Sequence, residues 1–444
     1  MEAADSAADA ILSTDHSQET LATAAGIATV DRPVVSSVQA DVNRTTGLDA
    51  AERIPAGLEQ SIQRTCRWLF DRQHADGHWC GELEGDSILQ SEYILLLAWL
   101  GEERTEPALR AARRLLEQQN PDGGWGMFPG SEMDISASVK AYFALKLTGH
   151  DPQSRPLRLA REAILRGGGA DRVNSFTRFY LALLGQIDYR HCPAVPPEAV
   201  LLPKWSPINI YRVSAWSRTI LVPLAIMWAF RPARELPADL GIDELMLEPP
   251  ERWPALRCPG RSGRRKFFSW ESLFQITDKS LKLAERIGFR PLRRRALSVA
   301  RQWMLDRFAD SDGLGAIFPP IVWSWIALRC LGYENNSPEV RECRRQLEDL
   351  MLSDSDDGPV RLQPCKSPVW DTAITLRALA GAGFGANHPD ARRAIDWLLD
   401  REVRSAGDWS EYVRTEPSGW FFEYRNKFYP DVDDTIMVMM ALSD

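Results

Sequence analysis

The sequence predicts an all-α fold, and three observations lead to this prediction. Apolar residues recur at helical spacing along most of the chain, no segment alternates strongly enough to require a sheet, and a short Gln, Gly and Trp phrase recurs where helices are expected to end. The 444 residues are 44% hydrophobic and 26% charged, which is an ordinary globular composition. At roughly 150 residues per domain, this length allows about three domains.

The expected elements begin with a leader and a first helix. Residues 1–54 are rich in Ala, Ser, Thr and Asp and contain no aromatic residue, so we expect a flexible leader. It lacks the basic start and the continuous apolar stretch of a secretory signal. Helical spacing then runs from Ala56 to Arg72. Further helices are expected at Tyr93–Leu100, Ala108–Gln119, Ala137–Leu147, Ser298–Phe308, Val322–Leu331, Asp371–Ala382 and Ala391–Val403.

The recurring phrase links these helices into repeats. Gln73–Trp79 (QHADGHW) and Gln119–Trp125 (QNPDGGW) share the same Gln, Gly and Trp spacing, and looser copies lie at Phe308–Gly313 and Glu402–Trp409. Asp-Gly favours a turn with a left-handed residue. The Trp ring can pack across a helix end while the Gln side chain forms hydrogen bonds there. Repeated helix, turn and helix units are typical of stacked or ring-closed helical pairs.

Charge, cysteine and hydropathy patterns exclude several classes of protein. The 53 Lys and Arg against 61 Asp and Glu leave a net charge of -8, which argues against a nucleic-acid partner. Seven Cys without a CxxC pair indicate neither a zinc cluster nor a disulfide framework, and a reducing compartment fits. The longest markedly apolar uncharged run, Thr219–Phe230, is shorter than the roughly 20 residues of a membrane-spanning helix.

The most distinctive acidic cluster is Asp431-Val-Asp433-Asp434-Thr435, which follows Pro430. Its simplest interpretation is a helix start, where carboxylates meet free amides and the positive end of the dipole. The letters also fit a phosphatase motif, but those enzymes need a preceding buried strand and a large following core. A magnesium site for a diphosphate would need a second acidic cluster and a phosphate-binding loop, and we find no convincing Gly-rich one.

A fourth interpretation is a Brønsted acid. Three crowded carboxylates cannot all ionise cheaply, so one can stay protonated near neutral pH. In a dry pocket such a carboxyl could protonate an alkene, provided that aromatic rings stabilise the carbocation. Core packing remains the simpler role for most of the nearby aromatic residues, which are Trp370, Trp409, Trp420, Phe421, Phe422, Tyr424, Phe428 and Tyr429.

Several segments together carry a family resemblance. They are Tyr429–Thr435, Gly419–Phe422, Ser367–Thr372, Trp79–Asp86, Ser91–Leu96, Phe176–Arg178, Val195–Glu198 and Pro207–Tyr211. From about residue 56 to the end, the chain resembles the squalene-hopene cyclases. The repeats are similar to that family's QW motifs, which bind neighbouring helices of its α/α barrels. The resemblance implies a complete first α/α barrel at 75–355, the start of a second at 356–444, and a helix at 55–74 that packs with the second barrel.

The resemblance also implies a reaction and its residues. Asp433 resembles the family's proton donor, and Asp431 and Asp434 resemble its flanking carboxylates. The reaction would be a squalene cyclisation to a hopanoid, without metal or other cofactor. A class II diterpene cyclase and a non-catalytic, lipid-binding helical-repeat module stay open as alternatives. Residues expected to line the substrate cavity are Trp370, Phe422, Tyr180, Ile317, Phe318 and Pro319, although Tyr180 stands where Trp is frequent and Phe318 where Gln is common.

A lipid substrate suggests a membrane. Ser217–Phe230 is either a buried helix or, as the family suggests, a helix dipping into one leaflet. The basic clusters Arg261–Lys266 and Arg290–Arg295 are either solvated loops or contacts to lipid head groups. We therefore expect a peripheral protein at the cytoplasmic face of a membrane, with squalene as ligand and a homodimer as an option. The family continues past the acidic motif to a His that pairs with the donor, and the last His here is His388; we expect little or no activity of the 444 residues alone.

Overall fold

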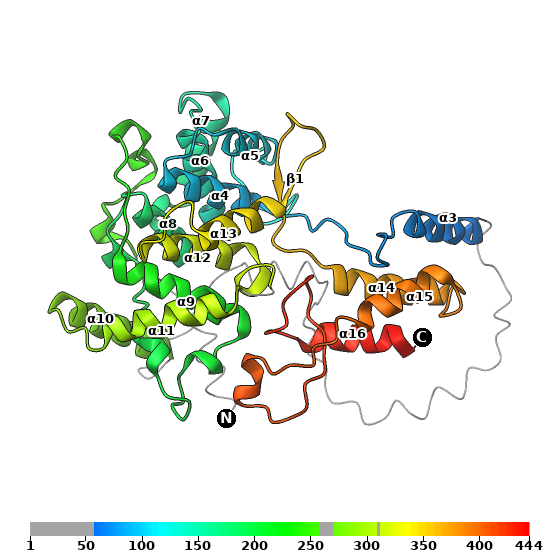
Figure 1. Cartoon of the computed structure of the whole chain (residues 1–444). Helices are drawn as coiled ribbons and strands as arrows, with labels where there is room; N and C mark the ends of the chain where they lie inside the picture. The colour runs from blue at the N-terminus through cyan, green and yellow to red at the C-terminus, as the bar shows by residue number, and fades with distance from the viewer. Residues whose placement is uncertain (1–56, 255, 257–269, 309–310, 444) are drawn as a thin grey trace, which may run out of the picture.

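The computed structural model describes residues 57–254, 256, 270–308 and 311–443. The predicted leader and the basic cluster Arg261–Lys266 lie outside these described residues. Across them the chain is helical, and the strands β1 (Met351–Leu352) and β2 (Arg361–Leu362) form one short antiparallel hairpin (Figure 1). The all-α prediction is confirmed.

A larger core is built from two kinds of helix, which we distinguish by how many faces they bury. The helices α4 (Ser87–Leu100), α6 (Ile135–Leu147) and α12 (Phe318–Cys330) are buried nearly all round. They are apolar on every face, as expected for central helices. The outer helices bury one stripe each and are α5 (Glu106–Glu117), α7 (Arg155–Arg166) and α13 (Pro338–Asp349).

The remaining helices of this larger core are α8 (Ser175–Leu183), α9 (Ala215–Phe230), α10 (Trp270–Arg286) and α11 (Arg293–Asp306). Helix α9 packs against α12 and α11. Its residues from Val222 to Trp228 are buried, so of the two interpretations of this apolar run the structure has the buried helix. No helix within the described ranges has the length and apolarity needed to cross a bilayer.

A smaller core forms from both ends of the described chain. It contains α3 (Leu58–Phe70), α14 (Pro368–Gly381), α15 (Pro389–Leu399) and α16 (Val432–Ser443). Figure 1 shows α3 beside α14 and α15, although about 300 residues separate them in sequence. Cys66 is buried there and the Phe70 ring meets Phe384 edge-on at 5.2 Å. Each helix expected from apolar spacing is present, as α3, α4, α5, α6, α11, α12, α14 and α15.

The two copies of the Gln, Gly and Trp phrase adopt the same geometry. The indole Nε1 of Trp79 donates to the Leu69 carbonyl at 2.7 Å, and that of Trp125 donates to the Leu115 carbonyl at 2.8 Å. Each indole thereby satisfies a carbonyl in the last turn of a helix, where intrahelical partners are missing.

The Gln side chains join these helix ends to a second helix. Gln73 Nε2 donates to the carbonyls of Gly77 and of Asp390, in the first turn of α15. Gln119 Nε2 makes the equivalent bonds to Gly123 and to Pro156, in the first turn of α7. The phrase therefore joins the end of one helix to the start of another that is not its neighbour in sequence, α3 to α15 and α5 to α7.

The Gly positions explain why the phrase tolerates no side chain there. Gly77 has φ 108°, and a Cβ on it would lie 2.6 Å from the Arg393 carbonyl oxygen.

The looser copy of the phrase, at Glu402–Trp409, behaves differently. The indole that donates to the end of α15 belongs to Trp420 and not to Trp409, and its Nε1 is 2.7 Å from the Leu398 carbonyl oxygen.

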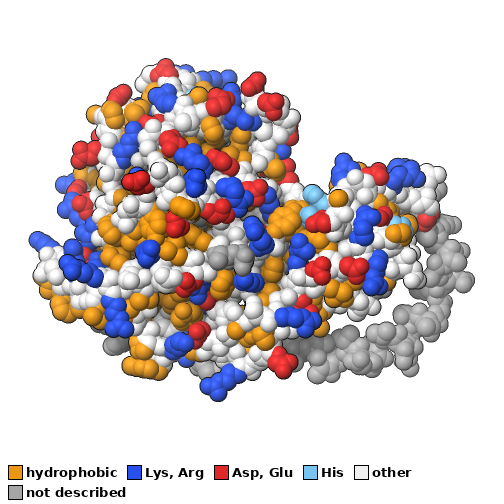
Figure 2. All heavy atoms as spheres, in the orientation of Figure 1, with side chains coloured by type: hydrophobic (Ala, Val, Ile, Leu, Met, Phe, Trp, Pro, Cys, Tyr) orange, Lys and Arg blue, Asp and Glu red, His pale blue; other side chains and the backbone are white. Residues whose placement is uncertain are grey.

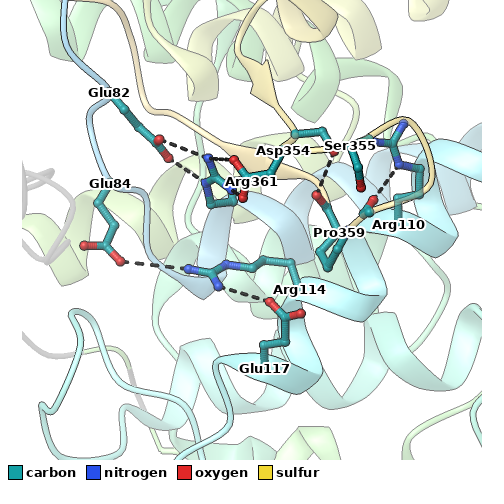
Figure 3. A network of polar contacts seen from close by, with 11 residues as sticks. Glu82, Glu84, Arg110, Arg114, Glu117, Asp354, Ser355, Pro359 and Arg361 are labelled. Atoms are coloured by element: carbon teal, nitrogen blue, oxygen red, sulfur yellow. Dashed lines mark hydrogen bonds and ion pairs between the residues drawn. The ribbon is translucent and has the colours of Figure 1, made fainter.

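An exposed ionic network fastens the β-hairpin loop to α5 (Figure 3). The Arg361 guanidinium pairs with Glu82 and with Asp354, each through a shortest N–O distance of 2.7 Å. Arg110 Nε donates to the Gly358 carbonyl at 2.7 Å, and Arg114 pairs with Glu117 at 3.1 Å. These contacts tie the segment between the two cores to the larger one.

Candidate active site

The acidic motif forms the first turn of α16. Asp431 caps the helix, because its Oδ1 accepts a hydrogen bond from the Asp434 amide at 2.9 Å. The backbone of Asp431 pairs with Trp420, and the Thr435 hydroxyl donates to the Asp431 carbonyl at 2.6 Å. The interpretation of this motif as a helix start is therefore confirmed, and the motif is held against the preceding Trp420 segment.

The helical period separates the two other aspartates. Asp434 lies on the inner face with Val438 and Ala441, and its exposed fraction is 2%. Asp433 is rotated by one residue and lies on the exposed face with Ile436 and Met440. The sequence analysis placed the un-ionised carboxyl at Asp433, whereas the structure buries Asp434; the assignment of the donor to Asp433 stays a prediction.

Burial controls the protonation of Asp434. Loss of hydration is the largest cause that raises the pKa of Asp434 well above its usual value, followed by the carboxyl groups of Asp431, Glu423 and Asp433. All the principal causes act in the same direction, so the protonated form of this carboxyl is favoured at neutral pH. The first turn of α16 thus stores a proton directly behind the exposed Asp433.

A further buried acid, Glu423, was missed by the sequence analysis. It has an exposed fraction of 1%, and burial, opposed by a hydrogen bond from Asn426, raises the pKa of Glu423 to about 8. Asn426 Nδ2 donates to Glu423 Oε2 at 2.9 Å. The one sequence signal for a buried acid here was that Glu423 directly follows the apolar residues Trp420-Phe-Phe422. An acid on the surface can follow such a run equally well, so this signal could not distinguish the two.

The structure brings two of the predicted cavity residues together. The rings of Trp370 and Phe422 lie 6.4 Å apart at 40°, and the Val369 amide donates to the Phe422 carbonyl. Both rings are half-buried beside the acidic segment. The adjacent Asp371 holds the extended Trp79 segment, since its Oδ2 accepts from the Gly81 amide at 2.8 Å.

The other predicted cavity residues lie in or next to the larger core. Tyr180 is fully buried, donates to Glu92 at 3.0 Å and packs 4.7 Å from the Trp323 ring. Ile317 and Phe318 are buried at the start of α12, where Phe318 hydrogen-bonds to the Pro364 carbonyl, and Pro319 is half-buried.

Comparison with known proteins identifies the family. A family model described as the squalene-hopene cyclase N-terminal domain matches residues 62–356, and one described as the C-terminal domain matches residues 366–444. The chain belongs to the squalene-hopene cyclase family. The squalene-hopene cyclase of Zymomonas mobilis subsp. mobilis is 40% identical over 392 residues, which cover 87% of this chain and 58% of that protein.

A less similar squalene-hopene cyclase, from Alicyclobacillus acidocaldarius subsp. acidocaldarius, is 32% identical over 385 residues. The aligned residues cover 86% of this chain and 59% of that protein. The chain therefore spans less than two thirds of these curated relatives. Among solved structures, abietadiene synthase from Abies grandis matches 86% of this chain and 40% of that chain, with 12% identity and a TM-score of 0.36.

In this squalene-hopene cyclase family member, a cavity adjoins the acidic motif. Its aromatic wall comes from Trp216, Trp409, Phe428 and Tyr429, and Asp431 lies at one end. The further residues that line this cavity are Ala215, Arg218, Thr219, Gly315, Asn426 and Pro430.

Among the described residues, no group of three or more His, Cys, Asp and Glu side chains is arranged to hold a metal ion.

Proposed function

We propose that this protein is a class II triterpene cyclase that protonates a squalene-type polyene and directs its ring closure. The proposal draws on the family membership and, above all, on one observation: the acidic turn of α16 buries Asp434 among other carboxyl groups behind an exposed Asp433. Burial and these neighbours raise the pKa of Asp434, so a proton is available in this turn at neutral pH, as general acid catalysis requires.

In this proposal Asp433 is the donor. Asp433 is the carboxyl of the cluster that a substrate can reach, because Asp434 is sealed inside the helix packing and Asp431 is engaged as the cap. In the proposed step the acid transfers its proton to an alkene carbon of the substrate. The polyene then forms a C–H bond and a tertiary carbocation.

The carbocation would be stabilised by the paired rings of Trp370 and Phe422. An aromatic face contributes about 0.5–2 kcal/mol to cation binding, and 2 kcal/mol corresponds to about thirtyfold in rate. In this proposal Tyr180, Ile317, Phe318 and Pro319 line a part of the substrate site in the larger core, apart from the cavity beside Asp431.

We further propose that the two layers of helices form α/α barrels. The all-round burial of α4, α6 and α12 and the one-sided burial of α5, α7 and α13 support an inner and an outer ring. The first barrel would span 75–355 and the second would begin at 356–444, with α3 packed against it.

A membrane surface is the proposed source of the lipid substrate. The apolar stripe of α10 contains Leu273, Ile276 and Leu283 and continues to Ile287, directly after the helix, and all four are exposed. Figure 2 shows hydrophobic side chains at the edge where Figure 1 places α10. We propose peripheral binding at the cytoplasmic face through this stripe instead of through α9. In vesicle sedimentation, the variant Ile276→Lys/Ile287→Lys should stay in the supernatant, and unchanged sedimentation would contradict the proposal.

The proposed reaction is tested with squalene and purified protein, with products identified by gas chromatography and mass spectrometry. Asp433→Asn should reduce cyclised product at least 100-fold, while Asp400→Asn, an exposed aspartate at the end of α15, should leave it unchanged. Equal activity of Asp433→Asn and wild type would exclude this donor. Cyclisation of geranylgeranyl diphosphate that depends on magnesium would favour a diterpene cyclase. Squalene binding without turnover, unaffected by Asp433→Asn, would favour a lipid-binding module.

A further inference from the structure

Glu423 lines one of two cavities that both contain a residue of the 3-10 turn η8 (Leu314–Ala316), and its hydrogen-bond partner Asn426 lines the other. The second cavity is the aromatic one described above, which Gly315, Asn426 and Asp431 line. Ala316 and Glu423 line the first cavity. The other residues around that first cavity are charged or polar with one exception, and they are Asp312, Arg345, Gln346, Asp349, Leu350 and Lys366.

The first cavity opens to solvent, because the side chains of Arg345 and Asp349 that line it are each about half exposed. Glu423 forms its buried end. Its hydrogen-bond partner Asn426 reaches the aromatic cavity, where Asp431 also lies. One carboxyl and one amide therefore connect a solvent-facing cavity to the acidic turn of α16.

The segment that carries these two side chains is held in place by backbone bonds. Asn426 forms a bridge with Ser311, and the Arg425 amide donates to Asp312 Oδ2 at 2.8 Å. One oxygen of Glu423 and one of Asp434 are buried without a hydrogen-bond partner among the described residues. Such oxygens are the positions that a bridging water requires.

The proposed cyclisation creates a need for this connection. In each turnover an O–H bond of the acid breaks and a C–H bond of the substrate forms, and the cation later loses a proton to water elsewhere in the cavity. The product is an isomer of the substrate, but the donor is left as a carboxylate. It must recover a proton before the next turnover. The adjacent Asp434 holds one, and because Asp434 has no direct access to solvent, a proton that it gives up must be replaced through the interior.

We propose that Glu423 relays protons from the solvent-facing cavity to the aspartates of α16, an inference that rests on the proposed function. After Asp434 has given its proton to the ionised donor Asp433, the Glu423 carboxyl gives its proton to the Asp434 carboxylate. The Glu423 carboxylate then takes a proton from solvent water in the first cavity, and the hydroxide stays in the solvent. Glu423 is thus a positioning residue for the proton, acting through the aspartates and not on the substrate.

The charges around Glu423 suit this role. Because its pKa lies near 8, the protonated form predominates at neutral pH and the carboxylate remains accessible. Asp431 and Asp312 oppose its ionisation, whereas hydrogen bonds from the Asn426 side chain and from the backbone favour it. The titratable and charged groups that face it are Asp312, Arg345, Asp349, Cys365, Lys366, Asp431 and Asp434.

The relay is tested by proton exchange, which needs no turnover. The C=O stretch of protonated Asp434, assigned by its loss in Asp434→Asn, is followed by infrared spectroscopy after mixing with D₂O. In Glu423→Gln, which keeps the side-chain shape, the exchange should be at least tenfold slower than in wild type. Glu416→Gln, on an exposed loop nearby, should exchange at the wild-type rate, and Glu423→Asp should restore part of the rate.

Equal exchange rates in wild type and a folded Glu423→Gln variant would overturn the relay. If Glu423→Gln does not fold, the wild-type spectrum decides, because the relay requires a glutamic acid C=O band that titrates near pH 8, and its absence overturns the proposal. With squalene, Glu423→Gln should complete a first turnover at the normal rate and then show a kcat at least tenfold lower with unchanged KM. Absence of squalene cyclisation by the wild type bears on the proposed function alone, and the exchange result still decides the relay.

Discussion

The larger and the smaller core both contain buried carboxyl groups, but they treat them in opposite ways. In the larger core, Glu92 pairs with the buried Lys140 at 2.6 Å and accepts a bond from Tyr180. At the boundary with the smaller core, Glu423 and Asp434 lie among further carboxyl groups, which raise their pKa together with burial. A buried acid beside a cation is structural, whereas a buried acid among acids keeps a proton that it can deliver.

Removing one partner of the ion pair should have the largest effect. Glu92→Gln leaves the Lys140 ammonium buried without its counter-charge, so the free energy of unfolding should fall by about 3–5 kcal/mol. Urea denaturation at neutral pH measures this loss. The double variant Glu92→Leu/Lys140→Met should recover most of it, because no charge then remains buried. A loss below about 1 kcal/mol in the single variant would show that the pair is dispensable.

Glu423 should show the opposite behaviour and a pH dependence. Its pKa is raised from 4.5 to about 8 by folding, so between these values the folded state holds a proton that the unfolded state has lost. Stability is therefore complete below pH 4.5 and decreases as pH rises, by about 2–3 kcal/mol between pH 5 and pH 7.

Glu423→Gln removes this dependence. Urea denaturation should show the variant close to wild type at pH 4.5 and more stable than wild type at pH 8. A variant that is less stable than wild type at pH 8 would indicate that the carboxylate is paired, as Glu92 is.

The repeated Gln, Gly and Trp phrase offers a matched pair across the two cores. Gln119→Ala and Gln73→Ala each remove two hydrogen bonds to carbonyls, so each should lower the free energy of unfolding by about 1–2 kcal/mol. Gln63→Ala on the exposed face of α3 is the control, with an effect within about 0.5 kcal/mol. Urea denaturation of the three variants compares them directly, and an effect of Gln73→Ala no larger than the control would show that the phrase matters in the larger core alone.

The smallest effect is expected at the exposed network of Figure 3. Arg361 pairs with Glu82 and Asp354, whose side chains are exposed by 37% and 84%. Arg361→Ala should therefore lower stability by less than about 1 kcal/mol at low salt. Calorimetry in about 1 M salt should show no difference from wild type, because salt screens exposed pairs. A difference that persists at high salt would mean that Arg361 contributes through packing instead of charge.

Local patterns in the sequence were enough for the helices and for the helix-end phrase. Apolar spacing within one segment predicts which residues form a helix. The eight helices predicted in this way end within four residues of the observed C-terminal ends, whereas their starts differ by up to six residues. The Asp431 cap and the position of the acidic motif at a helix start also follow from neighbouring residues alone.

The tertiary structure alone decided which carboxyl groups are buried. Asp433 and Asp434 are adjacent in sequence, yet only the packing of α16 against α14 places Asp434 inside and Asp433 outside. Glu423 is buried because Ser311 and Asp312 pair with the segment around Asn426, more than 100 residues later. Hydration loss depends on such contacts between distant segments, and so the protonation of these acids cannot be read from the order of the residues.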